Sequence, residues 1–168
     1  MKNITLLLAL IGIITLQSCN NDTATNTIDN DTISEVFEYS NVNFLPNSYS
    51  VVLTYPHPIY HSDMVLVYRL SGIYQGAAVW KLVPETYYFA DGTLDIRYDF
   101  DFTRFDTQVY MEGFNLPAVS SSYRLNQVFR VVIMPGFFGN KRSKLNFNDY
   151  NAVVRALHID ENSMLKVE

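Results

Sequence analysis

The most reactive side chain in the sequence belongs to Cys19, the only cysteine among 168 residues. A thiolate can act as a nucleophile or a metal ligand, and a thiol can also be the attachment point for another group. A single cysteine excludes a disulfide framework within the chain, a Cys-x-x-Cys redox pair and a multi-cysteine zinc site. Two roles remain open for Cys19 on these grounds: a thiol that does chemistry, or a site of covalent attachment.

The segment "YPHPIYHSD" brings two histidines and a carboxylate together, at His57, His61 and Asp63. Histidines four residues apart are typical of a metal site on a helix, where both imidazoles lie on one face. Pro56 and Pro58 flank His57 and disfavour a helix there. Because the segment lacks an evident catalytic nucleophile, we expect loop histidines without a catalytic or metal-binding role.

Carboxylates alternate along another short stretch, at Asp95, Asp99 and Asp101, with Asp106 close behind. Calcium takes about six to eight oxygens that converge from a loop. Residues two and four apart on a strand lie roughly 7 and 13 Å from each other, so these carboxylates cannot all reach one ion. Arg97 also lies among them. We interpret the stretch as a solvated face that discourages pairing at a sheet edge.

The sequence contains no Gly-x-Ser-x-Gly, no His-Glu-x-x-His and no phosphate-binding Gly-rich loop followed by Lys-Ser/Thr. The three consecutive serines at 120–122 are interpreted as a polar loop. We therefore expect no catalytic residues, no metal and no cofactor, and the protein is not predicted to be an enzyme.

Aromatic residues offer a different chemistry, since the chain has 12 tyrosines and 11 phenylalanines. Four tyrosines fall in expected loops or at strand ends and could contact a ligand: Tyr55, Tyr60, Tyr74 and Tyr123. Sugar-binding sandwiches stack such rings on pyranose faces, but aromatic-rich β cores use the same residues for packing. Both interpretations stay open, and Trp80 is expected to be in the core or half-buried.

The elements that would position these residues are strands. In "LDIRYDFDF", residues 94–102, apolar side chains alternate with charged ones, which predicts a half-buried antiparallel strand. Just before it, Asp91 and Gly92 predict a hairpin turn, because glycine tolerates a positive φ. Further strands are expected over 36–44, 49–55, 64–70, 78–83, 87–89, 108–114 and 128–134. Turn signals separate them, including Gly72, Gly76 and Pro135-Gly136.

About eight short strands without βαβ alternation indicate a sandwich or a closed barrel, and we predict an antiparallel β-sandwich over residues 35–168. One short C-terminal helix is expected, because Tyr150, Val153, Val154 and Leu157 recur with helical spacing. Asn148 or Asp149 can cap its first turn. This helix should pack across one open end or one face of the sandwich.

The chain before the sandwich is not expected to belong to the fold. Lys2 and the apolar run 4–16 are typical of a signal peptide, predicted over 1–18, and the run is shorter than the roughly 20 residues of a spanning helix. "LQSC" resembles the lipobox of bacterial lipoproteins. That resemblance implies that Cys19 receives a lipid and becomes the first residue after cleavage. Residues 19–34 would then be the lipidated cysteine and a flexible linker, rich in Asn, Asp and Thr.

The lipobox, "VLVYRL", "VWKLVPETYYFADGTLDIRYDFDF", "NQVFRVVIMP" and "DYNAVVRAL" together resemble a group of uncharacterised lipoproteins from Bacteroidota, of flavobacterial type. Some relatives carry collagen-like segments, and some carry a dihydrolipoamide dehydrogenase label. This chain has no Gly-x-Gly-x-x-Gly and no cysteine pair, so that redox chemistry does not apply to it. The resemblance implies an outer-membrane lipoprotein, with the periplasmic or surface-facing side left open.

The net charge of −5, without a basic stripe, argues against nucleic acid as a partner. We expect a lipid-anchored protein of the cell envelope with a non-catalytic binding or structural β-domain. Its partners would be the membrane, through Cys19, and a possible glycan or protein ligand. The alternatives are a carbohydrate- or peptide-binding accessory lipoprotein and, third, a small hydrolase.

Overall fold

The computed structural model describes residues 33–136, 138 and 145–167. The predicted signal peptide 1–18, the lipidation site Cys19 and the linker up to residue 32 lie outside the described residues. Within them the protein is an all-β sandwich built from two sheets, as predicted from the alternating sequence pattern.

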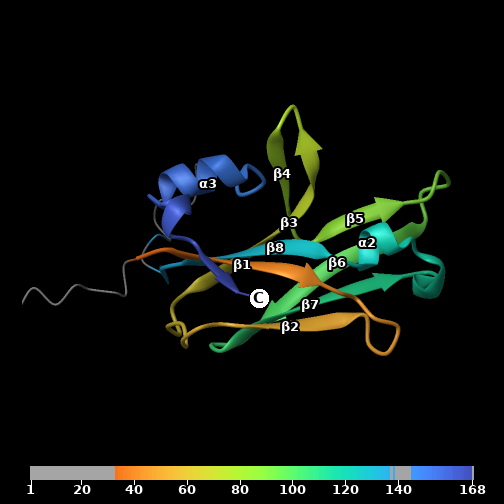
Figure 1. Ribbon diagram of the computed structural model, residues 1–168, viewed down its shortest axis with the longest axis horizontal. Helices are drawn as coiled ribbons and strands as arrows, with labels where there is room; N and C mark the ends of the chain where they lie inside the picture. The colour runs from red at the N-terminus through yellow and green to blue at the C-terminus, as the bar shows by residue number, and fades with distance from the viewer. Residues whose placement is uncertain (1–32, 137, 139–144, 168) are drawn as a thin grey trace, which may run out of the picture.

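One sheet has five strands in the order β4-β3-β8-β1-β9, and the other has four in the order β2-β7-β6-β5. The two sheets lie one above the other in Figure 1. The strands are β1 (Glu35–Val42), β2 (Ser50–Thr54), β3 (Met64–Tyr74), β4 (Ala77–Leu82), β5 (Glu85–Tyr88), β6 (Leu94–Phe102), β7 (Asp106–Gly113), β8 (Gln127–Met134) and β9 (Leu165–Val167).

The main core lies between the two sheets, where alternate residues of each strand point inward. Val67 and Val131 come from the five-stranded sheet and Tyr98 and Val109 from the other, and all four are fully buried. Tyr98 and Phe129 also meet edge to face, with 6.4 Å between ring centroids. The alternation in "LDIRYDFDF" therefore holds in the middle of β6, whereas Leu94 and Phe102 at its ends are exposed.

A second core lies on the outer face of the five-stranded sheet, where α3 (Tyr150–Ala156) packs. Tyr150 and Val153 of this helix lie against Tyr68 of β3, and Tyr68 donates a hydrogen bond to the carbonyl of Phe147. Because both faces of β3 are covered here, its residues 65–69 are buried without alternation. The expected C-terminal helix is confirmed, with Asp149 as its N-cap.

Three elements differ from the sequence-based expectation. The short strand β9 was not anticipated and pairs parallel to β1, although every other pairing is antiparallel. The serine-rich segment expected to be a loop forms a single helical turn, α2 (Ser121–Arg124), with Ser120 as its cap. Gly72 lies inside β3 at a bulge rather than in a turn, while Gly76 and Gly92 occupy turns with positive φ.

The two ends of the sandwich are separated by the length of β1. The described chain begins at Ile33, just before β1, and β1 runs from left to right in Figure 1. The other end of β1 reaches α2, because the amide of Phe44 donates to the carbonyl of Arg124. Eight strand residues span roughly 25 Å. The end of the sandwich at which β1 begins is thus far from the end that carries α2.

Candidate functional site

At the α2 end, a surface hollow of about 400 Å³ opens beside the four-stranded sheet. Its walls come from the β5–β6 turn, the start of β6, the 3-10 turn η3 (Leu116–Ala118) and α2. We call it the aromatic pocket. Its lining residues are Tyr87, Phe89, Asp95, Ile96, Phe114, Asn115, Ala118, Val119, Ser120 and Tyr123. Its size is within the range of small-ligand sites, which is roughly 300–1,000 Å³.

Two pairs of aromatic rings shape the pocket. Phe89 and Phe114 meet edge to face, with ring centroids 6.5 Å apart and planes at 85°. Tyr87 and Tyr123 do the same at 5.5 Å and 73°. Phe114 is 83% exposed, Phe89 44% and Tyr123 38%. Three rings therefore present surface to solvent around one hollow. Single exposed aromatic residues are common on protein surfaces, whereas a contiguous group of exposed rings indicates an interaction site.

The polar groups of the pocket are available to a ligand. The Asp95 carboxylate, the Asn115 amide group and the Tyr123 hydroxyl have no hydrogen-bond partner among the described residues. The main chain beside them is already satisfied, since the amide of Phe114 donates to the carbonyl of Asp95 at 3.1 Å. The lining of the pocket thus combines apolar ring faces with three polar residues whose side chains have no partner among the described residues.

Gly113 makes this junction possible. A Cβ at that position would lie 2.4 Å from the carbonyl oxygen of Asp95 and 3.2 Å from the side chain of Ile96. Only glycine lets the end of β7 approach β6 this closely. The approach sets Phe114 directly beside Asp95 at the pocket rim.

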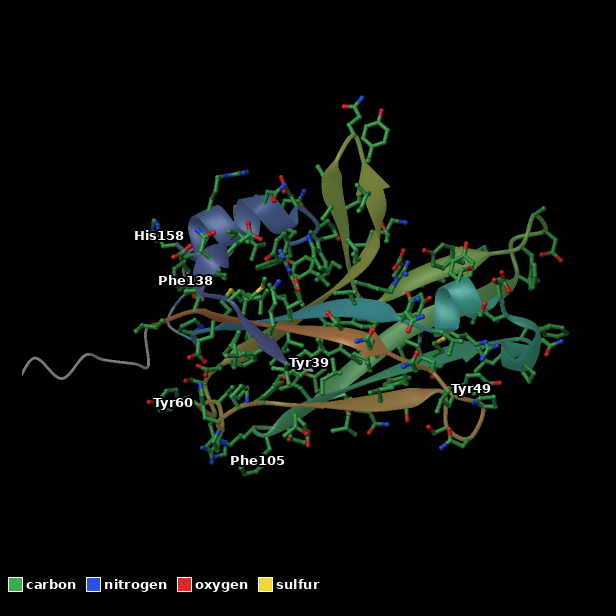
Figure 2. All side chains as sticks on the ribbon, viewed as in Figure 1. Tyr39, Tyr49, Tyr60, Phe105, Phe138 and His158 are labelled. Atoms are coloured by element: carbon green, nitrogen blue, oxygen red, sulfur yellow. The ribbon has the colours of Figure 1, made fainter. Side chains whose placement is uncertain are left out.

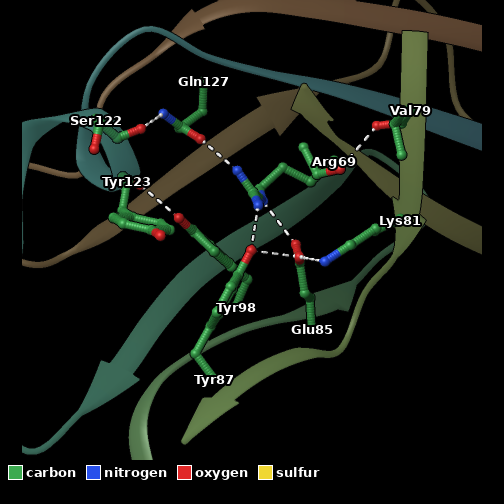
Figure 3. A network of polar contacts seen from close by, with 10 residues as sticks. Arg69, Val79, Lys81, Glu85, Tyr87, Tyr98, Ser122, Tyr123 and Gln127 are labelled. Carbon is green, nitrogen blue, oxygen red and sulfur yellow. Dashed lines mark hydrogen bonds and ion pairs between the residues drawn. The ribbon is translucent and has the colours of Figure 1, made fainter. Parts of the chain in front are cut away.

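A buried polar cluster lies directly behind the pocket (Figure 3). Its centre is Arg69 of β3, whose Nε donates to Glu85 Oε2 at 2.7 Å. The same guanidinium donates to Tyr87 Oη and to Gln127 Oε1, both at 2.8 Å. Tyr87 in turn donates to Glu85 Oε1 at 2.6 Å. We call Arg69, Glu85, Tyr87 and Gln127 the arginine cluster.

The arginine cluster reaches both walls of the aromatic pocket. On one side it fixes the hydroxyl of Tyr87, whose ring lines the pocket. On the other side the Gln127 amide donates to the carbonyls of Ser122 and Leu125, which belong to α2 and its end. Tyr98, under the Arg69 guanidinium at 4.5 Å, donates to the carbonyl of Tyr123 at 2.6 Å. One buried cation therefore positions the two elements that carry Tyr87 and Tyr123.

The protonation states within this cluster follow from its contacts. Burial by itself would raise the pKa of Glu85, but hydrogen bonds from Arg69, Tyr87 and Lys81 lower that pKa below its ordinary value. Burial and the hydrogen bond to Glu85 raise the pKa of Tyr87 to about 12. Burial also raises the pKa of Tyr98 above its ordinary value. At neutral pH the cluster therefore holds an ionised pair and neutral phenols.

The four tyrosines singled out from the sequence lie in different parts of the fold. Tyr55 is in the main core, with its hydroxyl 2.6 Å from Thr107 Oγ1, so its ring does not face solvent. Tyr60 is exposed in a loop at the Ile33 end of the molecule (Figure 2). Tyr74 is at the tip of the β3–β4 hairpin. Only Tyr123 lines the aromatic pocket. The fold does not bring these four residues together.

Sequence reasoning missed Phe89, Phe114 and the arginine cluster. Both phenylalanines directly precede or follow a turn signal, so their position at a strand end could have marked them. Arg69 and Glu85 gave no such signal, because an arginine in "VLVYRL" and a glutamate after a proline look like ordinary surface residues. Only the pairing of β3 with β8 and of β5 with β6 places them inside the sandwich.

The other chemical candidates have local roles. Arg97 contacts Asp99 at 3.0 Å and also pairs with Glu112, so part of the acidic face of β6 is neutralised. His57 Nε2 lies 3.2 Å from the Glu35 carboxylate. Within the part of the chain that the structure describes, no group of three or more His, Cys, Asp or Glu side chains is placed to hold a metal ion.

Comparisons with protein-family models, with curated proteins and with solved structures found no match to this chain. Among the described residues, no helix is both long enough and apolar enough to cross a membrane. The function is therefore argued from the geometry of the site and from the sequence pattern alone.

Proposed function

We propose that this protein is a lipid-anchored protein of the outer membrane whose β-sandwich binds a neutral sugar ring in the aromatic pocket. The role is binding rather than catalysis. The observation that carries the proposal is the grouping of the exposed Phe89, Phe114 and Tyr123 rings around one hollow that Asp95 and Asn115 also line.

The pocket suits a sugar for two reasons. A pyranose has apolar C–H faces that pack on aromatic rings and hydroxyl groups that need directed partners. The rings supply the first surface, and Asp95 and Asn115 at the edge of the hollow supply hydrogen-bonding groups. The lining contains one carboxylate and no cationic side chain, which disfavours phosphate, sulfate and other anionic ligands.

The lining also favours binding over hydrolysis. Glycoside hydrolysis by the common route uses two carboxyl groups that face each other across the scissile bond. The aromatic pocket has a single carboxylate and includes no imidazole, thiol or amine. The one serine of the lining, Ser120, has its Oγ 3.0 Å from Ser122 Oγ, which lies outside the lining.

The position of the pocket supports the anchored arrangement. The proposed lipid site, Cys19, precedes β1 in the sequence, and the pocket lies beyond the far end of β1. The site therefore opens at the end of the sandwich opposite to the point where the chain enters. An anchored protein of this design would present its pocket away from the attachment.

Calorimetric titration with a panel of neutral oligosaccharides (gluco-, manno- and xylo-configured) tests the ligand class. The Phe114→Ala variant should weaken binding by roughly two- to tenfold, since an aromatic contact contributes about 0.5–1.5 kcal/mol. Phe105→Ala is the matched control, because Phe105 is also exposed but lies outside the pocket. Equal affinities of the two variants, or no binding by any neutral glycan, would overturn the proposed ligand.

Metabolic labelling with a fatty-acid probe tests the anchor separately. The natural chain should incorporate the label and fractionate with the outer membrane, and Cys19→Ala should do neither. A labelled Cys19→Ala protein would refute lipidation at this residue and leave the sugar site untouched.

A further inference from the structure

The β3–β4 hairpin projects from the body of the sandwich (Figure 1). The neighbouring strand β8 pairs with β3 only as far as Arg69, so the rest of β3 and residues 77–80 of β4 extend past it as a two-stranded ribbon. The sequence of this ribbon, "LSGIYQGAAVW", has no charged residue over positions 70–80. Ile73 and Tyr74 at its tip are 73% and 68% exposed.

The outer edge of β4 carries hydrogen-bonding groups that no described residue meets. The carbonyl of Val79 accepts a hydrogen bond from Ser71 Oγ at 3.1 Å, so it points toward β3. Because these directions alternate along a strand, the backbone N–H and C=O groups of Ala78 and Trp80 point away from β3. In the described part of the chain β4 pairs with β3 alone. β4 contains no proline, and its only charge is Lys81.

The unpaired backbone N–H and C=O groups of β4 determine what kind of partner this edge can bind. An apolar, exposed ribbon would also suit a lipid surface, but unpaired backbone groups are strongly unfavourable in hydrocarbon. Native edge strands are normally blocked by charges, prolines or bulges, and an unblocked edge is a template for another strand. The open edge of β4 therefore suits an extended strand better than a lipid surface.

We propose that β4 pairs with β4 of a second copy of this chain, antiparallel and centred on Val79. This register sets the small Ala78 opposite Trp80, whose ring packs on Tyr150 and Arg130 of its own molecule, so no two large side chains face each other across the pair. It sets Lys81 opposite Ala77, so no like charges face each other. A two-fold axis through Val79 makes each of these contacts twice and closes the pair. The two five-stranded sheets then continue into one.

This dimer is independent of the proposed sugar site, since no residue of β4 lines the aromatic pocket. One strand and a ribbon tip make a small interface, at the low end of specific contacts. The expected dissociation constant therefore lies in the micromolar to millimolar range, and the association is reversible.

Sedimentation velocity over a concentration series measures the association on the chain from residue 20 onward, which keeps every described residue and lacks the lipid site. The sedimentation coefficient should rise with concentration toward that of a dimer. Ala78→Pro removes one outward donor from β4 without removing a bond to β3, and should raise the dissociation constant at least about tenfold. A natural chain that stays monomeric up to millimolar concentration would overturn the proposal.

Cysteine crosslinking tests the register and does not depend on the proline variant folding. The chain from residue 20 onward contains no cysteine, so Val79→Cys creates a single thiol that meets its own copy at the two-fold axis. Oxidation should give a disulfide-linked dimer in high yield. Val52→Cys, at the exposed edge strand β2 of the other sheet, is the matched control and should stay largely monomeric. Equal yields at the two positions would refute pairing through β4.

Discussion

Replacement of Arg69 by methionine removes the centre of the arginine cluster and keeps a long apolar side chain in its place. Arg69 makes three hydrogen bonds, to Glu85, Tyr87 and Gln127, at 2.7 to 2.8 Å. Breaking one side of a buried ion pair typically destabilises a protein by about 3–5 kcal/mol, because the other charge stays buried. Lys81 still contacts Glu85 at 3.1 Å. We therefore expect the lower end, about 3 kcal/mol.

Urea unfolding followed by circular dichroism measures this loss as a fall in the midpoint at constant m-value. In thermal unfolding, about 3 kcal/mol corresponds to a decrease of roughly 10–15 °C for a domain of this size. Lys81→Met is the matched control, since it removes a cation from the same carboxylate at a half-exposed position. That variant should lose no more than about 1 kcal/mol.

A double-mutant cycle with Glu85→Leu separates the pair from its surroundings. If most of the loss in each single variant comes from an abandoned buried charge, the double variant should cost far less than the two single variants together. Additive losses, or an Arg69→Met variant within about 1 kcal/mol of the natural protein, would contradict this account of the cluster.

Two further predictions concern pH and the pocket rim. Because the pKa of Glu85 is lowered in the fold, its contribution to stability is present above its unfolded pKa of about 4.3 and is lost as the pH falls through the folded pKa. Glu85→Gln should accordingly show a shallower loss of stability in acid, as measured by urea midpoints across pH. Gly113→Ala should destabilise the protein by about 1–3 kcal/mol in urea unfolding, since its Cβ would collide with the Asp95 carbonyl. Ala118→Gly, at an exposed pocket position, is the control and should stay within about 1 kcal/mol of the natural protein.

The sequence pattern was sufficient to predict the layers of the fold but not their ends. Alternation along β6 and helical spacing around Val153 could be recognised because the direction in which each side chain points is set by the local backbone geometry. Strand β9 has only three residues, which is too short for an alternating pattern to reveal it. The length of β3 was underestimated because Gly72 looks like a turn residue, whereas in the structure it accommodates a bulge.

The site was less predictable than the fold, because it is assembled from contacts between distant segments. Phe89 and Phe114 are 25 positions apart in the sequence, and a β6–β7 pairing is needed to bring their rings together. Tyr123 was a candidate because it lies in an expected loop, and the same argument about loops and strand ends also selected Tyr60 and Tyr74, which lie elsewhere. Aromatic composition indicates that a ring surface is possible, and the strand register decides which rings form it.

The arginine cluster matters more for the directed hydrogen bonds that it makes than for the stability that it adds to the fold. Two apolar side chains in place of Arg69 and Glu85 could stabilise the sandwich as well as the ion pair does. An apolar pair, however, would not fix the Tyr87 hydroxyl or the carbonyls at the end of α2, which the cluster holds through bonds of 2.7 to 2.9 Å. Those bonds set the positions of both pocket walls before any ligand arrives. A preformed pocket loses less conformational entropy on binding, so at the sugar site that we propose the cluster would contribute to affinity even where it contributes little to stability.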